Sequence, residues 1–104
     1  MRAAEGVHPM IKIIIEREIA EGMAHYYDCS LKRAMLKLNQ AEGCLGGETL
    51  TDAKNPQRRI TISTWRSIQD WEAWTVSADR QRLLLEINPL LAQSERISVL
   101  QQAA

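Results

Sequence analysis

Three tryptophans gather in the stretch Ile60–Trp74, and together they could hold a flat aromatic molecule. Apolar and polar residues alternate up to Trp65, which predicts a half-buried strand. After Ser67 the spacing of Trp71 and Trp74 becomes helical. Indole rings at such a corner can stack on a planar ligand, and they can equally form hydrophobic core. The sequence leaves both interpretations open: core alone, or core that also lines a cavity.

Three residues could move a proton. His25 lies near the start of an expected helix, and an unperturbed imidazole titrates close to neutral pH. Glu16 and Glu48 fall on expected strands and could act as bases if they were buried. Each of the three also has a plainer interpretation as a solvated surface residue. The candidate catalytic residues are therefore His25 and Glu16, with Glu48 as a further carboxylate.

Metal and cofactor chemistry has no motif in this chain. Cys29 and Cys44 lack CxxC spacing, which argues against zinc and favours two free, partly buried thiols in a reducing compartment. There is no glycine-rich phosphate loop, no HExxH and no GxSxG. We expect no bound metal and no cofactor.

Length and composition limit the function classes. A chain of 104 residues is one domain, and its stability as a monomer would be marginal. Its 13 basic and 13 acidic residues cancel, so no long-range attraction to nucleic acid or an anionic membrane is expected. No apolar run is long enough to cross a bilayer, and the first nine residues lack the apolar core of a signal peptide. These features predict a cytoplasmic protein.

The elements that would position these residues follow the order β-α-β-β-α-β. This order predicts an α+β fold, a ferredoxin-like sandwich whose antiparallel sheet carries its helices on one face. We expect residues 1–9 to be a disordered lead-in, residues 10–100 to be a single domain and residues 101–104 to be a tail. The expected strands cover 10–18, 44–52, 59–65 and 97–100, and the expected helices run from 23 to about 40, from 67 to about 76 and onward from Ser77.

A second copy of the chain is the predicted partner. Ile11, Ile13 and Ile15 point to one side of the first strand, whereas Ile14 points to the other. If both helices cover the first side, the side that carries Ile14 remains an exposed apolar face. Packing two such faces together would remove it, which predicts a homodimer through the sheet.

Several segments resemble the antibiotic biosynthesis monooxygenase family, which forms dimeric ferredoxin-like α/β barrels. They are the tryptophan corner, MIKIIIERE (10–18), GGETLTDA (46–53) and SADRQ (77–81), and the resemblance extends over about residues 10–100. It implies a cofactor-independent monooxygenase that acts on a quinol or polyphenol-like aromatic. It also implies a pocket between sheet and helices that would draw on Trp65, Trp71, Trp74, Tyr26 or Tyr27, and His25.

One branch of that family degrades haem, and this chain departs from its pattern. The branch has an Asn on the first strand, a Trp on the helix after the third strand and a His ten residues further along. Trp74 matches the tryptophan, but Leu84 occupies the histidine position and the first strand has no Asn. Haem degradation is therefore not expected. The alternative to a monooxygenase is a non-enzymatic dimeric barrel that binds a small hydrophobic ligand or serves as an interaction module.

Overall fold

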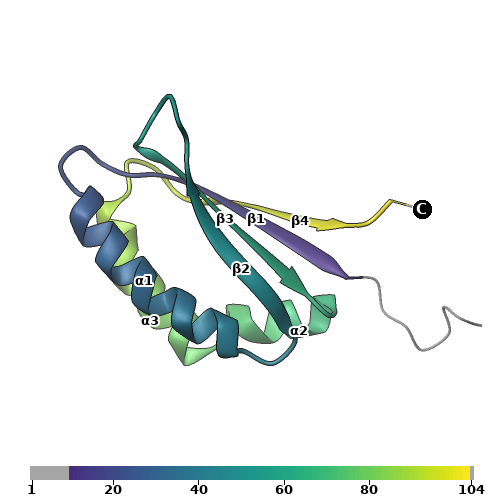
Figure 1. The fold of residues 1–104 in the computed structure, drawn as a ribbon. Coiled ribbons are helices and arrows are strands. Elements are labelled where there is room, and N and C mark those ends of the chain that lie inside the picture. Colours follow the sequence, from purple (N-terminus) through teal and green to yellow (C-terminus); the bar gives the residue numbers. More distant parts are fainter. Residues whose placement is uncertain (1–9, 104) are drawn as a thin grey trace, which may run out of the picture.

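The computed structural model describes residues 10–103, so the lead-in expected at residues 1–9 lies outside the described part of the chain. The elements of Figure 1 are β1 (Ile11–Glu18), α1 (Ala24–Gln40), β2 (Cys44–Thr51), β3 (Arg58–Trp65), α2 (Ile68–Thr75), α3 (Ala78–Ile87), the short 3-10 helix η1 (Asn88–Leu90) and β4 (Arg96–Gln101). The last strand thus includes Gln101, the first residue of the expected tail.

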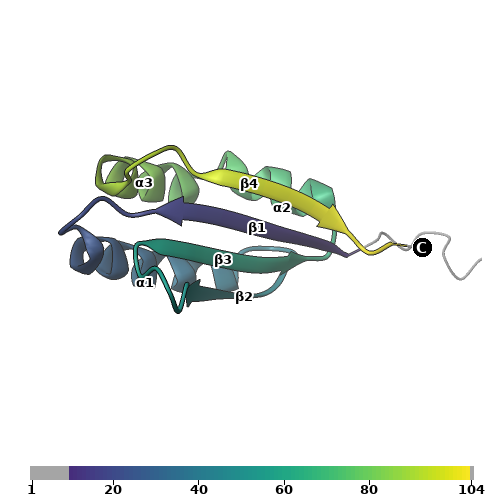
Figure 2. The same ribbon diagram turned by 90° about the horizontal axis from the view of Figure 1, so that it is seen from above.

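The four strands form one antiparallel sheet in the order β2-β3-β1-β4. Ile14 of β1 lies opposite Ile62 of β3 on one side and opposite Ser98 of β4 on the other. Figure 2 shows the three helices on the same face of this sheet. The predicted ferredoxin-like α+β fold is confirmed.

The two helices after β3 begin where serine side chains satisfy free backbone donors. Ser67 Oγ accepts a hydrogen bond from the backbone N–H of Asp70 at 3.2 Å, and Ser77 Oγ accepts one from Arg80 at 3.1 Å. Ser67 and Ser77 are therefore the N-caps of α2 and α3. α3 ends at Ile87, and Pro89 follows in η1. The helix stops there because proline has no N–H to continue its hydrogen bonds.

The glycine pair Gly46 and Gly47 in β2 allows a strand irregularity and a close helix contact. The pairing of β2 with β3 shifts between Cys44 and Gly46. Gly46 has a φ of 147°, a backbone conformation that residues with a side chain rarely adopt. At Gly47 a Cβ atom would lie 2.9 Å from a methyl carbon of Leu38, so the glycine lets α1 approach the strand closely.

The core lies between the sheet and the helices and has two parts. The part near the tryptophan corner contains Ile11, Ile13, Ile15, Leu38, Trp65, Trp71 and Trp74. The part at the other end contains Ile19, Tyr27, Leu31, Leu83 and Ile87. The alternation of isoleucines in β1 is as predicted, since Ile11, Ile13 and Ile15 are all buried.

In the part of the chain that the structure describes, no helix covers the opposite face of the sheet. Directly paired residues of antiparallel strands point to the same side, so the register defines this open face. Its apolar members are Ile14, Leu50, Ile60, Ile62 and Leu100. Charged residues share the face with them, among them Lys12, Glu16 and Arg58. Within residues 10–103, no helix is both long enough and apolar enough to cross a membrane.

Candidate functional site

A cavity lies between the covered face of the sheet and the helices. Its wall is mostly apolar but includes buried polar groups, and it is formed by Ile15, Arg17, Leu31, Ala34, Met35, Leu38, Thr61, Ser63, Trp71, Trp74, Arg80 and Leu83. Its free volume is about 20 Å³, and a water molecule needs roughly 10–15 Å³ by the same measure. The cavity can therefore hold one water in this conformation, and an aromatic ring enters only if wall residues move.

Two of the three tryptophans belong to this wall. Trp71 and Trp74 of α2 line the cavity, whereas Trp65 at the end of β3 lies behind them and is fully buried. The ring centroids of Trp65 and Trp71 are 5.8 Å apart with the planes at 65°, an edge-to-face arrangement. Trp65 Nε1 donates a hydrogen bond of 2.9 Å to Ser63 Oγ, which satisfies its only polar atom. The corner is thus core that also lines a cavity.

The polar end of the cavity is a buried ion cluster. Arg17 of β1 donates through Nε to Glu95 Oε1 at 2.9 Å, and Arg80 of α3 donates to the other oxygen of the same carboxylate. Arg17 is 3% exposed and Arg80 is 4% exposed. Glu95 lies in the segment between η1 and β4, which is held to the end of β1 by the hydrogen bond from Ala92 N–H to Glu18 O.

The cluster extends to one of the predicted tyrosines. Arg17 Nη1 donates to the hydroxyl of Tyr27 at 3.1 Å, and Tyr27 is fully buried. Burial lowers the pKa of the Arg80 guanidinium; the nearby charge of Arg17 adds to this effect, whereas Glu95 opposes it. Arg80 nevertheless stays protonated, because a guanidinium does not lose its proton in proteins. The cluster therefore holds two positive charges and one negative charge.

Thr61 of β3 contributes a further polar atom to the cavity wall. Its side chain lines the cavity and is 6% exposed, and its Oγ1 has no hydrogen-bond partner among the described residues. A buried hydroxyl without a partner costs folding free energy and is uncommon in native proteins. Thr61 lies opposite Ile15, on the strand beside Arg17, so this free hydroxyl belongs to the polar end of the cavity.

The other predicted site residues lie outside the cavity. His25 and Tyr26 are exposed on α1, where their rings make an edge-to-face contact. Glu16 points to the open face of the sheet and forms an ion pair of 2.6 Å with Arg58. Glu48 is exposed on β2. The roles of His25 and Glu16 as general bases remain predictions, and neither side chain lines the cavity.

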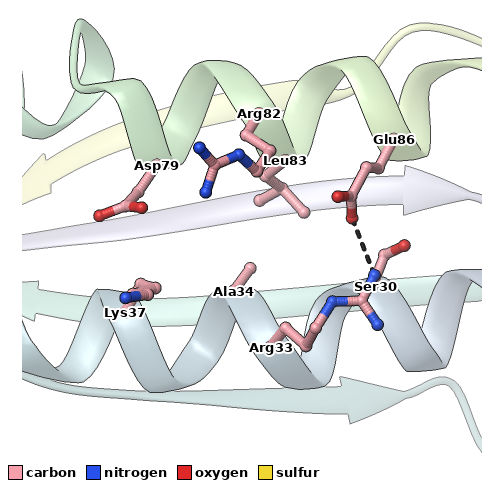
Figure 3. Close-up of a pocket in the computed structure, with 8 residues that line it drawn as sticks. All are labelled: Ser30, Arg33, Ala34, Lys37, Asp79, Arg82, Leu83 and Glu86. Atoms are coloured by element: carbon pink, nitrogen blue, oxygen red, sulfur yellow. Dashed lines mark hydrogen bonds and ion pairs between the residues drawn. The ribbon is translucent and has the colours of Figure 1, made fainter.

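Two surface grooves flank the cavity. Figure 3 shows the first, between α1 and α3, where Arg33 and Glu86 form an ion pair of 3.1 Å across the gap. Ala34 and Leu83 line both this groove and the cavity beneath it. Trp74 likewise lines both the cavity and the second groove, which lies near the start of α3 and has a volume of about 400 Å³. Each groove therefore shares part of its wall with the cavity.

No trio of His, Cys, Asp or Glu side chains within residues 10–103 is arranged to hold a metal ion. Cys29 and His25 form an exposed pair one helical turn apart, with Sγ and Nε2 separated by 3.8 Å. Both cysteines are free thiols, Cys29 exposed and Cys44 half-buried.

Arg17, Arg80, Glu95 and Thr61 were not predicted as site residues, although two of them carry a signal. Arg17 continues the inward alternation of Ile13 and Ile15, and Arg80 lies three residues before the buried Leu83. An arginine at an inward position of a strand or helix is unusual enough to mark it. Glu95 lies in an irregular segment where no periodicity could indicate it.

A family model for antibiotic biosynthesis monooxygenases matches residues 10–83, about seven-tenths of the chain. The chain belongs to the antibiotic biosynthesis monooxygenase family. The match includes β1, the tryptophan corner and the part of α3 that carries Arg80, so all the residues of the cavity wall lie inside it. Among curated proteins, none matches the sequence.

Solved structures of this family have the same fold. A proposed antibiotic biosynthesis monooxygenase from Nitrosomonas europaea matches with a TM-score of 0.87 at 12% identity, covering 91% of each chain. A second, from Bordetella bronchiseptica, gives 0.81 at 19% identity over 93% of this chain and 100% of its own. A third, from Caulobacter crescentus, gives 0.87 at 12% identity over 94% and 93%. At these identities the likeness establishes the fold alone.

Proposed function

We propose that this family member is a cofactor-independent monooxygenase that oxidises an electron-rich aromatic, such as a quinol or polyphenol, in the cavity between sheet and helices. The observation that carries the proposal is the meeting of two indole rings with buried polar groups in one cavity. Trp71 and Trp74 can stack on a planar ring, while Arg17 and Thr61 present N–H and O–H donors to its oxygen.

The reaction balances without an added reductant. A ring C–H beside or opposite a phenolic oxygen is converted to C=O, and the second oxygen atom of O₂ leaves as water together with the two hydrogens that the substrate loses. The substrate supplies all the electrons, so the protein needs only to bind it, favour its deprotonated form and exclude bulk water. The donors at the polar end of the cavity suit that task.

Entry of the substrate requires movement of the wall. Met35 of α1 lines the cavity, and an unbranched methionine side chain adapts its shape readily. Trp74 separates the cavity from the outer groove near α3, so rotation of its ring would join the two spaces. The proposal therefore includes a wall that opens at Met35 or Trp74 when the ligand binds.

The proposal also places the protein in a homodimer, formed through the open face of the sheet. Leu50 and Leu100 are 44% and 46% exposed there, beside Ile14 and Ile62. A contiguous apolar face of this kind favours association. The proposed cytoplasmic location rests on the sequence, and the free thiols Cys29 and Cys44 are consistent with it.

Oxygen uptake with a panel of quinols, naphthols and polyphenols tests the proposal. The assay is run without added metal or flavin and repeated with a chelator, and the products are analysed for one inserted oxygen atom from labelled O₂. We expect uptake with at least one substrate, unaffected by the chelator and reduced by truncation of Trp71. No uptake with any substrate, although one of them binds in the cavity, would contradict the monooxygenase assignment.

A specific observation favours a second candidate, a non-enzymatic barrel. The cavity has room for only about one water molecule, as would be expected if the corner served solely as core. In that case no aromatic from the panel would bind, and the role of the fold in this chain would be association through the sheet. Isothermal titration with the same panel separates this candidate from a ligand-binding protein.

A further inference from the structure

We propose that the polar end of the cavity is an anion site, built to receive the negatively charged oxygen group of a planar aromatic, as a phenolate or as an aryl carboxylate. This inference rests on the proposed function for its location and adds the charge of the ligand. The residues that would bind the charged oxygen are Arg17 and Thr61, with Arg80 beside them and Glu95 as the built-in counter-ion.

The first argument is the balance of charge. Two guanidinium groups, Arg17 and Arg80, share the one carboxylate of Glu95, and among the described residues none that lines the cavity is acidic. A net positive charge that is almost wholly buried is unfavourable, and arginine cannot escape it by losing a proton. A bound anion would neutralise the excess, so the cluster has more affinity for an anion than for a neutral ring.

The second argument is the free hydroxyl of Thr61. Its Oγ1 is the one buried side-chain polar atom without a hydrogen-bond partner among the described residues, and it faces the same cavity as the excess charge. Arg17 and Thr61 belong to neighbouring strands, two register positions apart on the same side of the sheet. A charged oxygen between them would accept hydrogen bonds from both, which would satisfy Thr61.

The third argument is the surroundings of that oxygen. The titratable and charged groups around it are Arg17 from β1, Tyr27 from α1, Arg80 from α3 and Glu95 from the segment before β4. Arg59 of β3 lies opposite Arg17 and over the Tyr27 ring, and its charge is balanced by an ion pair with Asp28 of α1. The wall residues from α2 and β3 are Trp71, Trp74, Thr61 and Ser63, which carry no charge. The site thus stabilises the ionised form of a phenol relative to its neutral form, and the phenolate is the form that gives up an electron to oxygen.

The test uses three ligands of nearly the same shape. Para-nitrophenol ionises to a coloured phenolate, benzoate is a carboxylate, and para-nitroanisole cannot ionise. We expect para-nitrophenol to bind at least about tenfold more tightly than para-nitroanisole, with affinity rising as pH passes through the ligand's own pKa. Benzoate distinguishes the two sources of the charge: tighter binding than the phenolate makes the carboxylate the natural group, and weaker binding makes it the phenolate.

Four variants separate an anion site from a merely structural ion cluster. Thr61→Val keeps the shape and removes the unpartnered hydroxyl, so it should preserve or raise the melting temperature while weakening para-nitrophenolate binding about tenfold. Thr49→Val makes the same change on the exposed position opposite Thr61 and should alter neither. Arg17→Gln should weaken binding of the anion, whereas Glu95→Gln should strengthen it by removing the competing carboxylate.

The outcomes decide the inference independently of the reaction. Equal affinity for para-nitroanisole and para-nitrophenolate, binding of neither, or unchanged affinity in both Thr61→Val and Glu95→Gln would overturn it, even if Arg17→Gln failed to fold. Preferential binding of the anion without oxygen uptake would leave the anion site standing and the monooxygenase assignment refuted. Oxygen uptake from a substrate that binds only as the neutral molecule would do the reverse.

Discussion

Trp74 packs against Trp65 with ring centroids 6.3 Å apart, yet only Trp74 borders both the inner cavity and the outer groove. Trp74 and Trp65 can therefore be compared as matched positions for substitution. Trp74 belongs to the core and to the cavity wall, whereas Trp65 belongs to the core alone.

Replacing either ring should separate packing from ligand binding. Trp65→Phe removes the hydrogen bond to Ser63 and should lower the melting temperature while leaving the affinity for a planar aromatic unchanged. Trp74→Phe should change that affinity more than it changes the melting temperature. Truncation of either residue to Ala should cost about 3–5 kcal/mol of unfolding free energy. Thermal unfolding and fluorescence quenching by a quinol analogue measure the two effects, and identical behaviour of the two Phe variants would contradict the assignment.

A charge at Ile14 should weaken the proposed dimer. Ile14 lies in the middle of the open sheet face, and a standard interface buries roughly 1,200–2,000 Å², so Ile14→Asp would bury a carboxylate there. Leu85→Asp, at a position that is 79% exposed on α3, is the control and should have no effect on association. Sedimentation velocity at micromolar concentration provides the measurement. A wild-type protein that sediments as a stable monomer would refute the dimer.

The turn between β2 and β3 should lose stability in acid. Asp52 Oδ1 accepts the backbone N–H of Lys54 at 2.8 Å, and this bond is the main reason that the pKa of Asp52 is lowered from 3.8. A carboxyl whose pKa is lower in the folded state stabilises the fold fully above its unfolded pKa, and the contribution disappears as pH falls through the folded pKa. Asp52→Asn should therefore flatten the dependence of stability on pH below about 4.

Chemical denaturation at a series of pH values tests this expectation. Glu48→Gln is the control, because that carboxylate lies exposed on β2, the strand that leads into this turn, and forms no hydrogen bond or ion pair with any described residue. An Asp52→Asn profile that runs parallel to the wild type down to the lowest pH would show that the turn carboxylate has no such role.

The two thiols should react at very different rates. Cys29 is exposed on α1, whereas Cys44 is half-buried at the start of β2, and burial raises the pKa of the Cys44 thiol above 9.0. Because the thiolate is the reactive form, iodoacetamide should modify Cys29 first and Cys44 only slowly at neutral pH. Mass spectrometry over time follows both sites. Cys29→Ser should retain only the slow reaction; a fast reaction in that variant would contradict the burial of Cys44.

The fold was accessible from the sequence because its signals are local. The isoleucine alternation in β1, the caps at Ser67 and Ser77 and the glycine pair in β2 each predict their structure from a few neighbouring residues. Their order along the chain then leaves the ferredoxin-like arrangement as the natural solution. The strand ends differ from the predicted ones by about one residue, which is the usual uncertainty at frayed termini.

Only the aromatic half of the site could be predicted from the sequence, because the residues of its polar half are far apart along the chain. Trp71 and Trp74 stand out as large aromatics on one helical face. The partners of the ion cluster are distant instead: Arg17 and Glu95 are 78 positions apart, and Glu95 lies outside any periodic element. His25 attracted a catalytic interpretation by its chemistry, yet its place on α1 leaves it exposed, since the inward positions there belong to Tyr27 and Leu31.

The central place of β1 in the sheet has a consequence for how the protein folds. β1 is the first strand of the sheet to leave the ribosome, but its two neighbours, β3 and β4, come from the middle and the end of the chain. Its pairings close long loops, which slows folding and leaves an isoleucine-rich strand unpaired during synthesis. The sheet can be completed only when β4 has emerged. Glu95, whose carboxylate neutralises Arg17, lies directly before β4 and becomes available at the same late stage.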